Sequence, residues 1–297
     1  MAWQTGWHKW KWVGFFLAPS LIGLLTFVVL PIASSFWMAL QDWNLLSPPE
    51  YVGIANFQEL FADTAFWSAL RNTLGYIVLY IPLVFLTALP VAVLLNQKLR
   101  GVLIVRTATY LPVVASWVVV SLIWKWIFNP QYGLINPPLG ILGIQMPAWL
   151  FEPGSALVAI VLTSVWKDLG YIAVMLLGGL QAIDETLYEA ARIDGASAMQ
   201  RFLRITLPLL TPTLFFVVII LLINSFQVFD QVWLMPMRDS AADRQVETIV
   251  TEVVKNAFSY NRMGYASAMS WVLFVIIFAI TFVQLRLQKR WVHYDAE

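Results

Sequence analysis

The sequence predicts an all-α integral membrane protein of six transmembrane helices with both termini in the cytoplasm. Three observations lead to this fold class: the composition, the spacing of long apolar stretches and the sorting of basic residues. Of the 297 residues, 60% are hydrophobic and only 12% are charged, and the mean hydropathy is +0.74. Soluble domains contain about 45–50% apolar and about 25% charged residues. The composition therefore excludes a water-soluble globular protein.

Six stretches are long and apolar enough to cross a bilayer, whose hydrocarbon core needs roughly 20 mostly apolar helical residues. They run approximately over residues 13–40, 70–95, 104–128, 156–180, 212–234 and 265–285. The first stretch follows two lysines, as a signal peptide would. It is longer than the about 7–15 apolar residues of such a peptide and shows no small-residue cleavage site. We expect it to be retained as a helix.

Basic residues predict the orientation of these helices, because Lys and Arg in short loops are retained on the cytoplasmic side. Eleven of the 18 basic residues fall on one face of the predicted layout: Lys9, Lys11, Lys98, Arg100, Arg106, Arg192, Arg201, Arg204, Arg286, Lys289 and Arg290. The loops 41–68 and 129–155 contain no Lys or Arg. Both termini, including the tail 1–12, are therefore expected in the cytoplasm, and the loop 235–264 is expected outside.

The residue inventory excludes several classes of function. A net charge of only +1 argues against a nucleic-acid partner. The chain contains no Cys, and its two His lie near opposite ends, so we expect no metal site and no bound cofactor. No hydrophilic module and no internal repeat interrupts the spans, so residues 1–297 are interpreted as a single membrane domain.

The loop between the fourth and fifth stretches, residues 181–212, predicts a helix, a turn and a second helix. Asp184 and Thr186 are both suitable N-caps for a short helix through Ile193. Gly195 suits the left-handed position that ends such a helix. From these features alone, an ordinary helical hairpin between two spans explains the loop as well as a docking surface does.

Small side chains and one anion give this loop a surface suited to close contact. Ala190, Ala191 and Ala196 leave little bulk, so that another backbone can approach. Glu189 offers a carboxylate to a basic residue on that other surface, and Asp194 precedes the turn glycine. The expected contact surface therefore comprises Glu189, Ala190, Ala191, Asp194, Gly195 and Ala196.

The complete string resembles a known family motif. Glu-Ala-Ala, two residues, Asp-Gly-Ala, and then Phe202, Ile205 and Leu207-Pro208 match the EAA loop. This loop is typical of the membrane-spanning subunits of binding-protein-dependent ABC importers. Further matching pieces resemble the carbohydrate branch, which includes the first maltose-transporter membrane subunit and the glycerol-3-phosphate permease. They are Ala18-Pro19, Asn56-Phe57, Arg71-Asn72-Thr73, Leu111-Pro112, Phe128-Asn129-Pro130, Phe229-Asp230 and Gly264-Tyr265-Ala266-Ser267-Ala268.

The resemblance implies a type I ABC importer permease fold and a set of partners. The EAA loop would act as a coupling helix that docks into a groove on a cytoplasmic ATPase subunit. The expected partners are a second permease subunit, two ATPases that use ATP and Mg, an extracytoplasmic solute-binding protein, a sugar substrate and membrane lipid. The expected location is the inner membrane of a prokaryote. The chain lacks a phosphate-binding Gly-rich motif, so we expect it to be no enzyme.

One departure from the family pattern lies after the fifth stretch. The family usually has a Gly-Gly-Pro turn there, whereas this chain has Met235-Pro236-Met237-Arg238-Asp239-Ser240. The geometry of the outer face is therefore expected to differ. Residues 245–258, further along this loop, have apolar residues at helical spacing and predict a short amphipathic helix.

Polar residues inside the predicted spans are candidates for a substrate site, since a charge at the bilayer centre costs about 2.5–3.5 kcal/mol. Two explanations for these polar residues remain open. They form hydrogen bonds that hold the helices together, including a Lys167–Asp pair, or they recognise a hydroxyl-rich substrate. Trp117, Tyr171, Phe226 and Phe229 would offer apolar faces to a sugar ring. The candidates from the residues and from the resemblance are Tyr171, Asn224, Gln227, Lys167, Asp168, Ser225, Asp230 and Trp117.

Alternatives to a sugar importer remain at this point. The same machinery importing a phosphorylated substrate such as glycerol 3-phosphate would give Lys167 an anion to bind. A membrane enzyme would need clustered His or paired catalytic groups. A channel or secondary transporter would leave the EAA-like loop unexplained.

Overall fold

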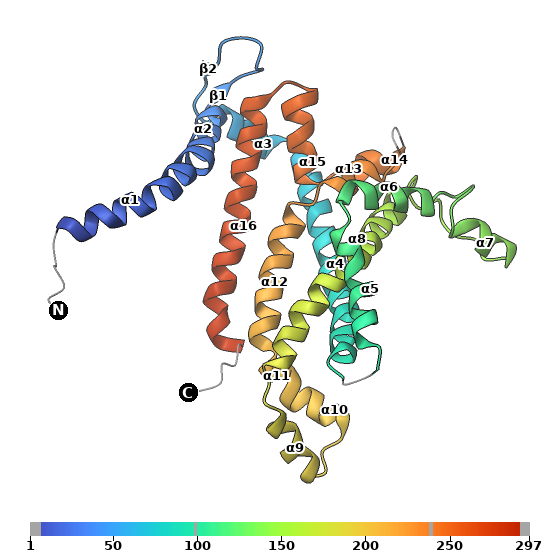
Figure 1. The fold of residues 1–297 in the computed structure, drawn as a ribbon. Helices are drawn as coiled ribbons and strands as arrows, with labels where there is room; N and C mark the ends of the chain where they lie inside the picture. The colour runs from blue at the N-terminus through green and yellow to red at the C-terminus, as the bar shows by residue number, and fades with distance from the viewer. Residues whose placement is uncertain (1–6, 98–99, 238–239, 292–297) are drawn as a thin grey trace. The chain divides into compact units, whose positions relative to one another are not determined.

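The computed structural model describes residues 7–97, 100–237 and 240–291, and these are mostly helical (Figure 1). Residues 1–6 of the predicted cytoplasmic tail, Lys98 and the pair Arg238-Asp239 of the unusual turn lie outside this description. The chain divides into two compact units. We describe each unit separately.

Five helices are long and apolar enough to cross a membrane, within the described residues. They cover Trp12–Ala39, Thr64–Leu95, Gly154–Gln181, Thr211–Leu234 and Met263–Gln288. A bent pair of helices, Val102–Val114 and Trp117–Ile127, makes a sixth if it is counted as one span. Each of the six predicted stretches is therefore found as helix, although two of them are interrupted. The orientation of the termini stays a prediction.

The first unit contains the chain up to Asp63 together with Val253–Val272. Its N-terminal helix is continuous over α1 (Trp7–Leu24), the π-helical turn η1 (Leu25–Val29) and α2 (Leu30–Ala39). The π-helical turn lies next to Pro31, which has no N–H to donate to the preceding turn. No residue in its most apolar window is buried.

Short polar segments complete this unit. They are the antiparallel strands β1 (Gln41–Asp42) and β2 (Glu50–Tyr51), with Gln41 opposite Tyr51, and the helix α3 (Ala55–Ala62). The Asn56 amide donates to the carbonyl oxygens of Ala39 and Gln41, each at 2.9 Å. The guanidinium of Arg262 donates to both carboxylate oxygens of Glu59, at 2.5 and 2.6 Å. The Arg262–Glu59 pair joins residues 203 positions apart in the sequence.

The second unit contains Thr64–Glu252 and Leu273–Glu297. The helices α4 (Thr64–Leu95), α8 (Pro153–Gln181) and α12 (Thr211–Phe226) contact one another in its core (Figure 1). Transmembrane helices associate through small residues that let their backbones approach. The small side chains buried on α4 and α8 include Ala69, Thr73, Ala88, Ala92, Ala156, Ala159 and Ala173.

Gly170 allows the closest approach between α8 and α5 (Val102–Val114). A Cβ atom built at Gly170 would overlap the carbonyl oxygen of Thr109. Because the obstacle is backbone rather than a flexible side chain, only glycine fits at this crossing.

The third predicted span is present as two helices that are joined at a bend. The helix α5 ends at Val114, and α6 (Trp117–Ile127) continues after a bend of 100°. Ala115 and Ser116 are extended, and the Ser116 hydroxyl accepts a hydrogen bond from the N–H of Val119 at 3.3 Å. Pro112 in the last turn of α5 removes one helical donor, and Ser116 begins a new helix.

The fifth predicted span is also interrupted. α12 ends at Phe226, residues 227–229 are not helical, and α13 (Asp230–Leu234) follows. The Thr248 hydroxyl donates to the carbonyl oxygen of Val228 at 3.0 Å. This bond satisfies a carbonyl that the break removes from the helical pattern, as non-helical backbone at membrane depth requires.

The loops that follow α6 and α13 contain four further helical segments within the described residues. They are α7 (Asn136–Ile141), α14 (Ala241–Gln245), α15 (Ile249–Val254) and η3 (Lys255–Ser259), which precede the last helix α16 (Met263–Trp291). The helix predicted over 245–258 is present from Ile249 as α15, which continues directly into the π-helical turn η3. In the unusual turn, Met235 and Pro236 are buried, and the Met237 N–H donates to Leu150 O at 3.1 Å.

Candidate functional site

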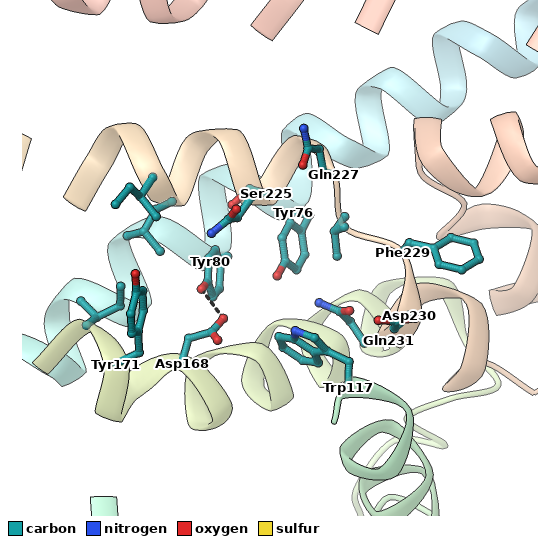
Figure 2. A pocket seen from close by; sticks show the side chains of 15 residues that line it. Tyr76, Tyr80, Trp117, Asp168, Tyr171, Ser225, Gln227, Phe229, Asp230 and Gln231 are labelled. Atoms are coloured by element: carbon teal, nitrogen blue, oxygen red, sulfur yellow. Dashed lines mark hydrogen bonds between the residues drawn. The ribbon is translucent and has the colours of Figure 1, made fainter. Parts of the chain in front are cut away.

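A cavity of about 320 Å³ lies among α4, α6, α8, α12 and α13 in the second unit (Figure 2). Its volume falls at the lower end of the range for small-molecule sites, about 300–1,000 Å³. The side chains that line it are Tyr76, Tyr80, Trp117, Asp168, Tyr171, Ile172, Ile220, Leu221, Asn224, Ser225, Gln227, Val228, Phe229, Asp230 and Gln231.

Asp168 and Tyr80 form the strongest polar contact in the cavity wall. The Tyr80 hydroxyl, on α4, donates to Asp168 Oδ2, on α8, at 2.6 Å (Figure 2). A hydrogen bond of this length to a carboxylate is charge-assisted. It fixes the orientation of Asp168 and leaves the second carboxylate oxygen able to accept a further hydrogen bond.

Two tyrosines of α4 form an aromatic wall that the sequence analysis missed. The rings of Tyr76 and Tyr80 stack with centroids 5.2 Å apart and an interplanar angle of 13°. Their spacing of four residues places them on one helix face. Two tyrosines spaced four residues apart within a span are the signal in the sequence that could have indicated this wall.

Ser225 lies in the wall with its hydrogen-bonding capacity unused. Its side chain is 2% exposed, and its hydroxyl has no hydrogen-bond partner among the described residues. The neighbouring Gln231 amide does have one, since Nε2 donates to the Ser164 hydroxyl at 3.2 Å. A buried hydroxyl without a partner costs about 1–3 kcal/mol, so a ligand or water that bonds to Ser225 would be stabilised.

Seven of the eight residues proposed for substrate contact line this one cavity. They are Tyr171, Asn224, Gln227, Asp168, Ser225, Asp230 and Trp117. Of the two further aromatic candidates, Phe226 does not line the cavity. Phe229 lines it but points away from the other labelled side chains in Figure 2, with its ring stacked on Trp233 at 5.5 Å. The break after Phe226 lies in the cavity wall, since Gln227, Val228 and Phe229 all line it.

Lys167 is the exception, since it is not among the residues that line the cavity. Its ammonium group donates to the carbonyl oxygens of Val113 at 3.2 Å and Pro112 at 3.5 Å, at the end of α5. It also lies 4.9 Å from the ring centroid of Trp117. Where α5 ends, the carbonyls of its last turn have no N–H donor four residues further on. The buried ammonium group of Lys167 donates hydrogen bonds to them instead. The Lys167–Asp pair considered from the sequence is thus replaced by two separate contacts, because Asp168 bonds to Tyr80.

The charge of the cavity wall is negative. Asp168 and Asp230 both line it, whereas no Lys or Arg occurs among the described lining residues. Carboxylates and amides accept and donate hydrogen bonds to hydroxyl groups. The wall therefore favours a neutral, hydroxyl-rich ligand over an anion.

The predicted helix, turn and helix lie at one end of the bundle (Figure 1). The helix α9 (Glu185–Ile193) begins at Asp184, whose carboxylate accepts from the Thr186 N–H at 2.9 Å. This backbone hydrogen bond lowers the pKa of Asp184 below its ordinary value. Of the two N-caps considered from the sequence, the structure selects Asp184.

The turn after α9 is a Schellman motif, which confirms the predicted role of Gly195. Its φ is +76°. The Ala196 N–H donates to Ala191 O at 2.9 Å, and the Gly195 N–H donates to Arg192 O at 3.1 Å. This paired arrangement satisfies the last carbonyls of the helix and requires a left-handed residue at Gly195.

The loop presents an exposed surface that combines an anion with apolar groups. Glu189, Ala190, Asp194 and Gly195 are exposed, while Ala191 and Ala196 are half-buried. Ile193 is 87% exposed.

A second short helix follows the turn. α10 (Ala198–Arg201) begins with a capping box, in which Ser197 and Gln200 exchange side-chain and backbone hydrogen bonds. The chain continues through η2 (Phe202–Thr206) and α11 (Leu207–Leu209) into α12. The hydroxyls of Tyr188 and Thr206 are 3.0 Å apart and link α9 to η2.

Comparison with known proteins gives concordant results. Residues 65–293 match the family described as the binding-protein-dependent transport system inner membrane component. The chain is 36% identical to the probable ABC transporter permease protein YesP of Bacillus subtilis (strain 168), over 95% of this chain and 92% of that protein. It is 33% identical to the trehalose/maltose transport system permease protein MalF of Thermococcus litoralis, over 92% of each chain.

A solved structure shares the fold. It is a bacterial alginate ABC transporter in complex with an alginate pentasaccharide-bound periplasmic protein. One of its chains matches with a TM-score of 0.83 and 25% identity, over 95% of this chain and 96% of that chain. The predicted ABC importer permease fold is confirmed, and the relatives are named as permeases rather than enzymes. The chain therefore belongs to the family of inner membrane components of binding-protein-dependent transport systems.

Proposed function

We propose that this chain is the membrane-spanning subunit of an ATP-driven importer that moves a neutral sugar or polyol across the inner membrane of a prokaryote. An extracytoplasmic solute-binding protein delivers the substrate, as the complex of the alginate transporter with its periplasmic protein suggests. The name of the trehalose/maltose permease supports a carbohydrate substrate. The chain itself binds no cofactor in this proposal.

The cavity inside the bundle is the observation that carries this proposal. It places Asp168, Asn224 and Gln227 beside the rings of Trp117 and Tyr171. Sugars are held by multiple hydrogen bonds and by an apolar platform beneath the ring, and the wall supplies both. The unpartnered hydroxyl of Ser225 offers one further bond.

A phosphorylated substrate such as glycerol 3-phosphate is the second candidate, and the charges of the cavity disfavour it. Lys167, the residue that would attract an anion, is bonded to the carbonyls of Pro112 and Val113. Asp168 and Asp230 would repel a phosphate. We therefore give preference to an uncharged substrate.

The loop of α9 and α10 is the proposed site of energy coupling. Its exposed Glu189, Ala190 and Ile193 would dock into a groove on a partner ATPase, which binds and hydrolyses ATP with Mg. Two such ATPases would close together and move this chain and a second, homologous permease subunit between inward-open and outward-open states. The Schellman turn at Gly195 would keep the docking helix in a fixed orientation.

Uptake kinetics of Gln227→Leu test the substrate cavity. The Gln227 side chain is exposed within the cavity. Loss of about 1.5 kcal/mol of hydrogen bonding would raise KM about ten-fold. Gln245→Leu is the matched control, because Gln245 is exposed at the end of α14, outside the cavity. Equal KM and specificity in both variants would remove Gln227 from the site.

Transport by Gly195→Asp tests the coupling loop. An Asp at φ +76° is strained and adds a charge to the docking surface, so we expect insertion into the membrane without transport. Gly143→Asp is the control, since Gly143 has φ +77° and equally open surroundings but lies in an external loop. Normal uptake by Gly195→Asp would contradict the assignment.

A further inference from the structure

A second cavity, of about 880 Å³, lies in the second unit beside the loop of α9 and α10. It is separate from the substrate cavity, and the two share no lining residue. Its wall is formed by Val93, Leu95, Asn96, Gln97, Val102, Arg106, Leu180, Gln181, Ile183, Glu185, Tyr188, Arg192, Ala198, Arg201, Phe202 and Thr206.

Three arginines from three different helices line this cavity. Arg106 comes from α5, Arg192 from the last turn of α9 and Arg201 from the end of α10. Among the lining residues that the structure describes, Glu185 is the only acid. Three cations in one wall repel one another unless an anion lies between them. The local charge therefore favours a negatively charged ligand.

The guanidinium groups are not used up by internal contacts. Arg106 Nε is buried and has no hydrogen-bond partner within the described part of the chain. In the same part of the chain, no ion pair joins Arg106, Arg192 or Arg201 to a carboxylate. A buried donor without a partner costs about 1–3 kcal/mol, so the cavity gains free energy when an acceptor enters it.

The rest of the wall combines apolar side chains with polar ones, among them Asn96, Gln97 and Gln181. Leu95 and Leu180, at the ends of α4 and α8, are buried, and Val93, Val102 and Ile183 also line the cavity. A wall that combines three arginines with apolar side chains fits an amphipathic anion. Inorganic phosphate would satisfy the arginines but would leave the apolar side chains without a partner.

We propose that this cavity binds the phosphate group of an anionic phospholipid from the adjacent leaflet. Arginine guanidinium groups recognise phosphate oxygens through paired, charge-assisted hydrogen bonds. Basic pockets between transmembrane helices are known places for lipid headgroups. Because Arg192 and Arg201 belong to α9 and α10, the bound lipid would brace the loop against the ends of α4 and α5. This proposal does not depend on which substrate the transporter carries.

Native mass spectrometry of the purified transporter complex tests the proposal. Phosphatidylglycerol, phosphatidylcholine and inorganic phosphate are each titrated into the delipidated complex, and the bound fraction is measured. We expect phosphatidylglycerol to bind in preference to phosphatidylcholine. Arg106→Gln and Arg201→Gln should each weaken this binding about five-fold, the factor for one basic residue near a membrane surface.

Arg204→Gln is the matched control, because Arg204 is exposed in the same loop but is absent from the cavity wall. Arg106→Lys keeps the charge and should retain most of the binding, which separates loss of the site from loss of folding. Equal binding of the two lipids, or equal losses in Arg106→Gln and Arg204→Gln, would overturn the proposal. Displacement of phosphatidylglycerol by millimolar phosphate would show that the free anion, not the lipid, is the ligand.

Discussion

Replacing Lys167 by methionine distinguishes a structural cation from a substrate-binding one. The Lys167 side chain is 5% exposed, and its ammonium group bonds to the carbonyls at the end of α5. Methionine keeps the length and the apolar stem but removes the charge and the donors. The carbonyl of Val113 then loses the Lys167 bond at the 100° bend between α5 and α6, whereas Pro112 O still accepts from the Ala115 N–H at 3.3 Å.

The size of the effect follows from the contacts. The 3.2 Å bond to Val113 from a charged donor is worth about 1.5–3 kcal/mol in soluble proteins, but hydrogen bonds between transmembrane helices average about 0.6 kcal/mol. The 3.5 Å bond to Pro112 adds little at that length. The cation–π contact with Trp117 contributes about 0.5–2 kcal/mol. We therefore expect Lys167→Met to lower the free energy of unfolding by about 2 kcal/mol.

A loss of about 2 kcal/mol lowers the thermal midpoint by about 3 °C, since a chain of 297 residues has an unfolding entropy of roughly 0.6 kcal/mol/K. The midpoint is measured in detergent, and uptake kinetics are measured in parallel. We expect the KM to remain within about two-fold of the wild type, because Lys167 does not line the cavity. Arg204→Met, at an exposed position, controls for loss of one charge. A KM raised ten-fold or more with an unchanged midpoint would refute this reasoning.

Two further predictions concern the packing and the break of the third span. Gly170→Ala should destabilise the chain by about 1–3 kcal/mol, because the new methyl group meets the backbone of Thr109, whereas Gly178→Ala on the same helix, with open space around it, should be neutral or slightly stabilising. Thermal unfolding of both variants checks this, and equal midpoints would contradict it. Ser116→Ala should cost about 1 kcal/mol by removing the N-cap of α6, and Ser116→Asn should restore the stability in the same assay. No loss in Ser116→Ala would show that the break is held by other contacts.

The loop of α9 and α10 was predictable because its structural determinants are local. Asp184 caps α9 by accepting from the N–H of Thr186, two residues further on. Gly195 ends the helix in a turn whose hydrogen bonds span three and five residues. Such motifs depend on neighbouring residues alone. The positions of the helices were predictable for a similar reason, since hydropathy over about 20 residues reports length and environment directly.

The break in the third span was not predictable from hydropathy. Residues 104–128 are mostly apolar, and Pro112 and Ser116 are the local signals of a bend. Proline is tolerated in many transmembrane helices because neighbouring groups satisfy the freed carbonyls. Here the carbonyls at the end of α5, those of Pro112 and Val113, accept from Lys167, which is 55 residues away from Pro112 in the sequence. Only the packing of α5 against α8, permitted by Gly170, brings the two together.

The cavity among α4, α6, α8, α12 and α13 was predictable in part. The polar residues of the fifth span were identified by their cost in the membrane, and they do share one cavity. Tyr76 and Tyr80 were missed because tyrosine is common in spans and carries no formal charge. Their placement beside Asp168 depends on the contact between α4 and α8, which spans 88 residues in the case of the Tyr80–Asp168 bond.

ATP-driven uptake in proteoliposomes tests the central claim most directly. The vesicles contain this chain, its partner permease and the ATPase subunits, with the solute-binding protein added outside and ATP enclosed. We predict that the neutral sugar bound by that protein accumulates only when both ATP and the binding protein are present, and that Gly195→Asp abolishes accumulation. Uptake that proceeds without ATP, or that Gly195→Asp leaves intact, would contradict the proposal that this chain is the coupled permease of an importer.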